Sequence, residues 1–221
     1  MAPTHAENKT EPYAPDGSHL RQNQIQWEDL ARCPLEDLAN LTLAIPLPGH
    51  RLQFRFLGKD IWVDIPNQCL MHVRGDEGIP LDDPLLELVT LVYLNQVNAL
   101  LPLDRDIVGL QDLKESHFFV GPHELRTANV LERYGGDPRA FQQAVASLEG
   151  RMVDMADTAC RLLPFPRIPL YFLIWFADEE FPARLRVLFD RSIEQFLPAD
   201  AIWALVNRVA RALVDGTAIG T

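Results

Sequence analysis

The feature that most constrains the fold is a pair of apolar runs near the end of the chain, separated by a short acidic segment. The first run covers residues 168–176 and follows Pro164 and Pro166, and the second covers residues 185–189. Both contain the branched and aromatic residues that favour buried strands. Because only a few residues separate the runs, we expect two neighbouring strands joined by an acidic turn.

A second hairpin is predicted where residues 51–57 and 61–65 alternate between apolar and polar side chains. Each strand then has one polar face, which is typical of an antiparallel sheet with a single buried side. We also expect strands at residues 41–45 and 69–73. Residues 74–84 are polar and rich in turn formers, so they are predicted to form a loop.

The spacing of apolar residues and the capping signals predict the helices. Asp82 or Asp83 is expected to cap a helix that has Pro84 at its first position, and Asp137 is expected to cap another. The expected helices cover residues 24–32, 85–101, a segment that ends at 135–136, 137–150 and 197–216, and a further strand is expected from Thr158. Because the strands cluster instead of alternating with helices, we predict an α+β fold: antiparallel hairpins packed with several helices.

Length and composition predict one folded domain. The chain has 221 residues, of which 48% are hydrophobic, so it can bury a substantial core. Residues 1–22 have almost no large apolar side chains and are expected to form a flexible tail. Residues 23–215 are assigned to a single α+β domain, and residues 216–221 to a C-terminal tail.

Charge and cysteine content exclude several classes of protein. A formal net charge of −11 argues against a nucleic-acid-binding surface and against contact with an anionic membrane. Cys33, Cys69 and Cys160 are widely separated, which fits neither a disulfide framework nor a cysteine-ligated cluster. The N-terminal residues show no apolar secretion signal, and no apolar stretch is long enough to span a membrane, so we expect a cytoplasmic protein.

The candidate ligand-binding residues gather around the acidic turn. Asp178 and Glu180 share one face of an extended segment, and Glu179 points the other way. These carboxylates can bind a hard cation or supply a general acid, or they can simply form a solvated turn. The hydrophobic side chains of Trp175 and Phe176 come directly before them and are expected to line the same site.

Two residues earlier in the chain are added to this site as candidates. Arg167 can pair with an anionic ligand or with the acids of the turn. His117, with the phenylalanines that follow it, can meet a metal or a flat cofactor together with His123. Cys69 and His72 form a CxxH pair, but residues three apart on a strand point to opposite faces. These residues do not identify a metal or a cofactor. The sequence also contains no nucleotide-binding, hydrolase or zinc-protease motif.

One family resemblance rests on the order of these elements. The proline-flanked strand, DEEFPA at residues 178–183, LFD at residues 188–190 and a terminal helix resemble a domain-of-unknown-function family of bacteria and archaea, many of them anaerobes. The resemblance covers the chain from Trp27 to Leu213. Some members are fused to a cysteine-rich iron–sulfur domain, so the resemblance implies a setting in anaerobic cofactor or metal metabolism, without an established activity.

From these observations we expect a non-catalytic binding or accessory protein. Its partner would be a protein or a small molecule that binds near the acidic hairpin. One alternative is a cation-dependent enzyme that uses Asp178 and Glu180. A second alternative is a structural subunit of a larger protein complex.

Overall fold

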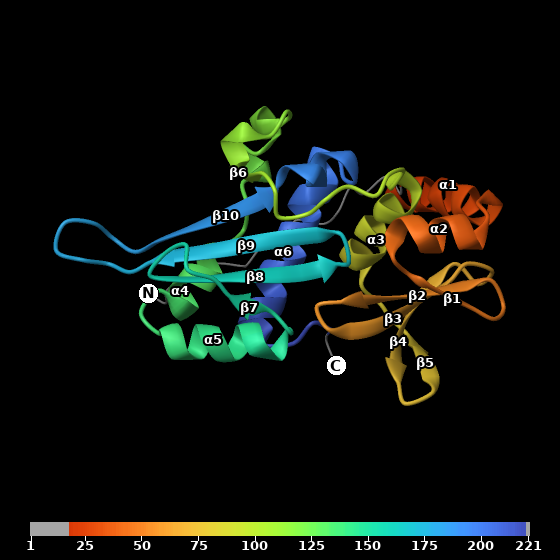
Figure 1. Ribbon diagram of the computed structural model, residues 1–221, viewed down its shortest axis with the longest axis horizontal. Coiled ribbons are helices and arrows are strands. Elements are labelled where there is room, and N and C mark those ends of the chain that lie inside the picture. The colour runs from red at the N-terminus through yellow and green to blue at the C-terminus, as the bar shows by residue number, and fades with distance from the viewer. Residues whose placement is uncertain (1–17, 220–221) are drawn as a thin grey trace, which may run out of the picture.

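The first half of the chain forms a meander of five antiparallel strands, sheet A (Figure 1). The computed structural model describes residues 18–219, and all statements on the structure refer to these residues. The strands of sheet A follow in chain order: β1 Ile45–Leu47, β2 Arg51–Phe56, β3 Lys59–Asp64, β4 Cys69–Arg74 and β5 Glu77–Pro80.

The predicted hairpin at residues 51–65 is confirmed as strands β2 and β3. Leu57 and Gly58 form the turn, with φ values of 46° and 80°. Two-residue hairpin turns of this kind need positive φ at both positions, a conformation that glycine adopts without strain. The alternation predicted from the sequence then places Phe54 and Phe56 inside the protein, where they are 3% and 0% exposed.

Two local predictions in this half are wrong. The strand expected at residues 41–45 begins only at Ile45, the first residue of β1, because Leu41 and Thr42 end helix α2, which covers Leu35–Thr42. The Thr42 hydroxyl donates to the Leu38 carbonyl at 2.6 Å, and Leu43 ends the helix with a φ of 58°. Residues 77–80, expected within a loop, form β5, which pairs with β4 although its own residues have little strand propensity.

The second half of the chain forms sheet B, in the order β6-β10-β9-β8-β7. Strands β9 and β10 confirm the predicted acidic hairpin, since they pair antiparallel from Trp175 opposite Arg184 to Leu170 opposite Phe189. The strands are β6 Ile107–Gly109, β7 Arg151–Met152, β8 Thr158–Phe165, β9 Ile168–Trp175 and β10 Arg184–Asp190.

Six α-helices complete the single-domain α+β fold that the sequence predicts. Asp83 and Asp137 cap α3 and α5 as expected, accepting hydrogen bonds from the Leu86 and Ala140 amides at 3.0 and 2.9 Å. None of the described helices is both long and apolar enough to cross a membrane. Besides α2, the helices are α1 Ser18–Arg32, α3 Pro84–Gln96, α4 Ala128–Tyr134, α5 Pro138–Ser147 and α6 Ala199–Asp215.

Both ends of the described chain differ from the predicted tails. Helix α1 begins at Ser18, so residues 18–22 are helical, while residues 1–17 of the predicted tail lie outside the described residues. Near the other end, Ala218 is fully buried and its carbonyl accepts a hydrogen bond from Arg208 at 2.6 Å. Arg208 also pairs with Asp83 at 2.5 Å, so it joins α6 to the start of α3.

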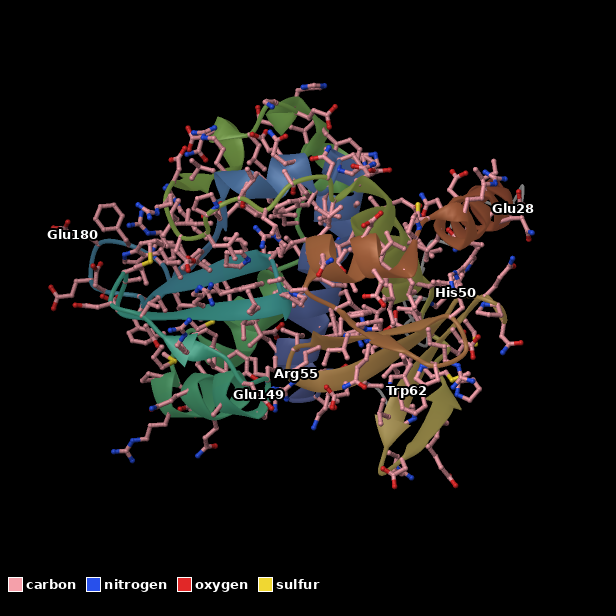
Figure 2. The ribbon with its side chains drawn as sticks, turned by 45° about the vertical axis from the view of Figure 1, so that its right-hand side comes forward. Glu28, His50, Arg55, Trp62, Glu149 and Glu180 are labelled. Carbon is pink, nitrogen blue, oxygen red and sulfur yellow. The ribbon has the colours of Figure 1, made fainter. Side chains whose placement is uncertain are left out.

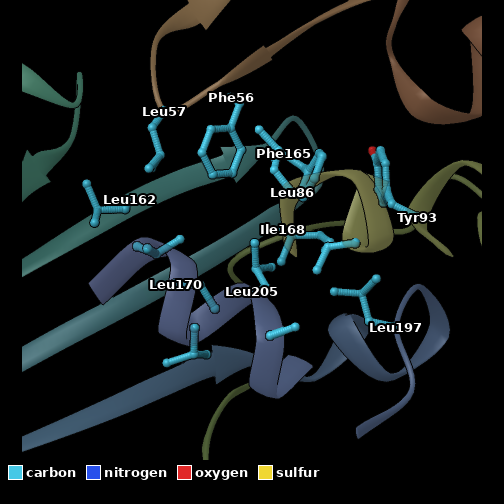
Figure 3. Packing of buried hydrophobic residues seen from close by; sticks show 14 of the residues in the cluster. Phe56, Leu57, Leu86, Tyr93, Leu162, Phe165, Ile168, Leu170, Leu197 and Leu205 are labelled. Atoms are coloured by element: carbon cyan, nitrogen blue, oxygen red, sulfur yellow. The ribbon is translucent and has the colours of Figure 1, made fainter. Parts of the chain in front are cut away.

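The two sheets share one hydrophobic core, and Phe165 lies where they meet (Figure 3). The ring of Phe165 is fully buried. Its centroid lies 5.3 Å from the ring centroid of Phe54, 5.8 Å from that of Phe56 and 4.8 Å from that of Tyr93. Strand periodicity would point Leu162 and Phe165 to opposite faces of sheet B. A register shift between these two residues, next to a proline, lets both enter the core.

We expect Phe165→Ala to lower the free energy of unfolding by about 3–5 kcal/mol, because it leaves a cavity between the sheets. Urea unfolding followed by circular dichroism measures this loss. Phe181→Ala is the matched control, because Phe181 is 65% exposed, and its effect should stay within about 0.5 kcal/mol. Equal losses in the two variants would show that Phe165 does not hold the sheets together.

Candidate functional site

The acidic residues predicted as a site lie at the tip of the β9–β10 hairpin. Asp178, Glu179 and Glu180 are all exposed, and Figure 2 shows Glu180 at the far end of this projection. The Asp178 carboxylate accepts hydrogen bonds from the amides of Phe181 and Glu180 at 2.7 and 2.8 Å, which lowers the pKa of that carboxyl. Asp178 therefore closes the turn with its own side chain.

Arg167 and His117 lie elsewhere in the fold. Arg167 follows the far end of β8, is 6% exposed, and donates to the Leu101 carbonyl at 2.5 Å. Its guanidinium lies over the ring of Phe196, 5.7 Å from the centroid, so it contributes to packing. His117 is exposed on a short turn that contacts α6. The structure thus does not bring these two residues to the acidic turn.

The two aromatic candidates, Trp175 and Phe176, pack on different sides of sheet B at the base of the hairpin. Phe176 packs against the hydrophobic core, and its amide donates to the Asp157 carboxylate at 2.8 Å. Trp175 instead belongs to a small apolar cluster on the other side of sheet B, built on Tyr171 and Leu173. Adjacent residues of a strand point to opposite faces, so only Trp175 reaches that second face.

This second face of sheet B carries a group of arginines, here called the arginine face. We define it by Arg151, Arg161, Arg184 and Arg186, together with Tyr171 and Trp175. The strand register places these side chains on one side of the sheet, since Arg151 lies opposite Arg161, Arg161 opposite Tyr171, and Trp175 opposite Arg184. Figure 1 shows this side toward the viewer, with α6 behind the sheet.

At the centre of the arginine face, the carboxylate of Asp104 accepts hydrogen bonds from two side chains of the face, Arg161 and Tyr171. Asp104 accepts two hydrogen bonds from Arg161, at 3.0 and 2.9 Å, and a third from the Tyr171 hydroxyl. Burial alone would raise the pKa of Asp104, but the bonds from Arg161 and Tyr171 lower it. Burial and the neighbouring Asp104 raise the pKa of Tyr171 to about 12. Asp104 is therefore ionised and Tyr171 protonated at neutral pH.

At the edge of the arginine face, the arginines are open to solvent. The Arg184 guanidinium lies over the Trp175 ring, 4.7 Å from its centroid, so the two side chains form a cation–π contact. Arg186 is exposed on the same side of β10, because it lies two residues farther along the strand. Arginine and tryptophan presented in this way are the residues that most often dominate protein interfaces.

The arginine face was not predicted from the sequence, although the sequence contains a signal for one part of it. Residues 184–187 alternate arginine with apolar residues, which indicates a strand with one charged side. No local pattern points to Asp104, which is 57 residues from Arg161 and 67 residues from Tyr171. Asp190 lies at the end of β10 that is remote from the acidic turn, is 2% exposed and pairs with Ile107 of β6.

The depressions of the described surface include two shallow ones. One, of 350 Å³, lies between residues 113–119 and the start of α6. The other, of 420 Å³, follows the border of β10 next to the arginine face. Within residues 18–219 no group of three or more His, Cys, Asp or Glu side chains is placed to hold a metal ion.

Comparison with known proteins identifies a family. The model of the family described as "Domain of unknown function (DUF3786)" matches residues 35–212. This confirms that the chain resembles a domain of unknown function over most of its length. No curated protein and no solved structure matches the chain.

We expect Asp104→Asn to lower the free energy of unfolding by about 1–2 kcal/mol at neutral pH, because it removes charge-assisted hydrogen bonds to Arg161. Asp104 has a lower pKa in the folded than in the unfolded protein. Its contribution is therefore complete above the unfolded pKa of about 4 and is lost as the pH falls through the folded pKa.

Urea unfolding of both proteins at about pH 7 and about pH 3 checks this expectation. The difference between wild type and Asp104→Asn should shrink at the lower pH. Asp76→Asn, in the exposed β4–β5 turn, is the control and should leave stability nearly unchanged at both values. A difference that stayed constant with pH would contradict an ionised Asp104 in this network.

Proposed function

Because the chain belongs to the DUF3786 family, a domain of unknown function, we propose a function from its geometry: the protein is a non-catalytic binding module that recognises an acidic partner protein through the arginine face. One observation carries this proposal. One face of sheet B gathers four arginines with a tyrosine and a tryptophan. The centre of this face is buried, and Arg151, Arg184 and Arg186 are exposed around it.

The charge of the whole chain makes this face unusual. The chain has 31 acidic residues against 20 lysines and arginines, so an average part of its surface carries negative charge. Asp104 pairs with Arg161, which leaves Arg151, Arg184 and Arg186 as the exposed positive charges of the face. A positive area on a negative protein attracts an acidic partner and orients it on approach.

The composition of the face supports a protein partner over a small molecule. Arginine, tryptophan and tyrosine are enriched at protein interfaces, where flat aromatic and guanidinium groups bury area at low entropic cost. The Asp104 network fixes Arg161 before a partner binds, which reduces the ordering cost of association. Tyr171 is 3% exposed and completes that network without facing solvent. Small-molecule sites, by contrast, usually enclose most of their ligand.

The family resemblance adds a setting to this proposal. It favours a role in anaerobic cofactor or metal metabolism, in which an accessory protein would bind an enzyme or a carrier protein. The alternative of a cation-dependent enzyme rests on Asp178 and Glu180, and one Asp178 oxygen already accepts two amides of its own turn. The alternative of a structural subunit shares the arginine face as its contact surface.

The test of the binding function reverses the charge of the exposed arginines. We expect the double variant Arg184→Glu and Arg186→Glu to lose its partner, with affinity falling roughly 30-fold or more if one of them is a hot spot. Partners captured from a lysate of the source organism, prepared without oxygen, would be quantified by mass spectrometry. The binding of the purified partner would then be measured at low and high salt.

Arg139→Glu is the matched control, because Arg139 is an exposed arginine on α5. It makes the same change of charge away from the face and should keep the partner. Equal capture by wild type and the double variant would contradict the proposal. Tight Mg²⁺ or Mn²⁺ binding in calorimetry, lost in Asp178→Ala, would favour the enzyme alternative instead.

A further inference from the structure

Strand β10 has an open border over the first part of its length. Strand β9 pairs with β10 from Arg184 to Phe189, but on the other side β6 pairs only with residues 188–190. Among the described residues, no strand therefore covers residues 184–187 on that side. Backbone N–H and C=O groups on such a border are free to pair with another strand.

A groove runs along this open border. The 420 Å³ depression is lined by residues 185–188 of β10, by residues 109–111 after β6, and by Leu125 and Thr127 on the opposite wall. The wall contributed by Leu125 is apolar, as are Leu185 and Val187 on the core side of β10. The groove thus offers backbone groups along one side and apolar side chains at its base.

Some of the features that usually prevent another strand from pairing with a sheet edge are absent from this border of β10. Residues 184–188 contain no proline, and the described strand β6 stops at Gly109, which leaves residues 184–187 without a partner strand on this border, next to residues 110–112. Charge remains as protection, because Arg184 and Arg186 stand side by side on the outer side of β10. If a second copy paired through the same border, arginines of the two copies would face one another and repel.

We propose that this border accepts one extended segment of the acidic partner, which adds a strand to sheet B beside β10. The segment alternates acidic with apolar residues. Its acidic side chains lie over the arginine face beside Arg184 and Arg186, and its apolar side chains enter the groove toward Leu185 and Leu125. Strand addition of this kind draws affinity from main-chain hydrogen bonds and specificity from alternate side chains.

This inference rests on the proposed function, and it adds the binding mode and the pattern of the partner's sequence. The arginine face alone would recognise negative charge in any conformation. The open border requires an extended backbone with free amides, and the alternation requires acids at every second residue. These two requirements can be separated by experiment.

The probe is a fluorescent hexapeptide that alternates glutamate with valine, blocked at both ends. Two versions carry N-methyl groups, one on the glutamate amides and the other on the valine amides, so that both keep the same charges. In an added strand only alternate amides point at β10. We therefore expect the parent peptide to bind and one methylated version to lose roughly tenfold or more in affinity, while the other binds nearly as well as the parent.

Protein variants locate the binding. Arg184→Glu with Arg186→Glu should abolish binding of the parent peptide, Arg139→Glu should not, and a peptide that alternates lysine with valine should not bind wild type. Amide hydrogen exchange should slow in residues 184–187 when the parent peptide is added. Protection at the β7 border instead would overturn the assignment to β10.

The outcomes separate this inference from the function on which it rests. If both methylated peptides bind like the parent and charge reversal still abolishes binding, strand addition is wrong while the arginine face stands as an acidic-partner site. If the parent peptide does not bind, the inference is overturned, and partner capture tests the function independently. If the protein alone sediments as a dimer that residues 184–187 hold together, a second copy occupies the border and the inference is also overturned.

Discussion

The burial of Phe165 is the constraint on which the rest of the structure depends. This ring joins β8 of one sheet to β2 of the other and to Tyr93 of α3, so a single side chain connects three layers. It reaches that position only because β8 shifts its register between Leu162 and Phe165. Without the shift, strand alternation would direct the ring to the outer face of sheet B, and the sheets would lose their common core.

The same packing decides which side of sheet B meets solvent. The core side is occupied by α6 and its neighbours and by the sheet junction, and apolar residues of β8, β9 and β10 fill it. Within residues 18–219 no helix lies over the opposite side (Figure 1), although Val153 and Ala156 pack against its centre. Arginines at the exposed border of that side keep their hydration, and Asp104 offsets the desolvation of the most buried of them, Arg161. The arginine face is thus a consequence of where the core lies.

The hairpin β9–β10 gives this face its charge pattern. Three carboxylates stand at its exposed tip, while Arg184 and Arg186 begin its return strand beside Trp175. Opposite charges that follow one another along the tip of one hairpin create a field that favours one orientation of a charged partner over the other. In this arrangement the acidic turn contributes to orientation, and the arginines and the tryptophan contribute the contact.

The sequence by itself determined the two hairpins and the capped helices α3 and α5, because alternation, turn residues and N-caps are local signals. It placed the acidic turn correctly between its strands. Only the tertiary structure decided the rest. It brought Asp104 to Arg161 and Tyr171 from distant parts of the chain, gave β5 its place through pairing with β4, and left β10 open because β6 is short. Such contacts depend on how the elements pack, and no local pattern of residues encodes them.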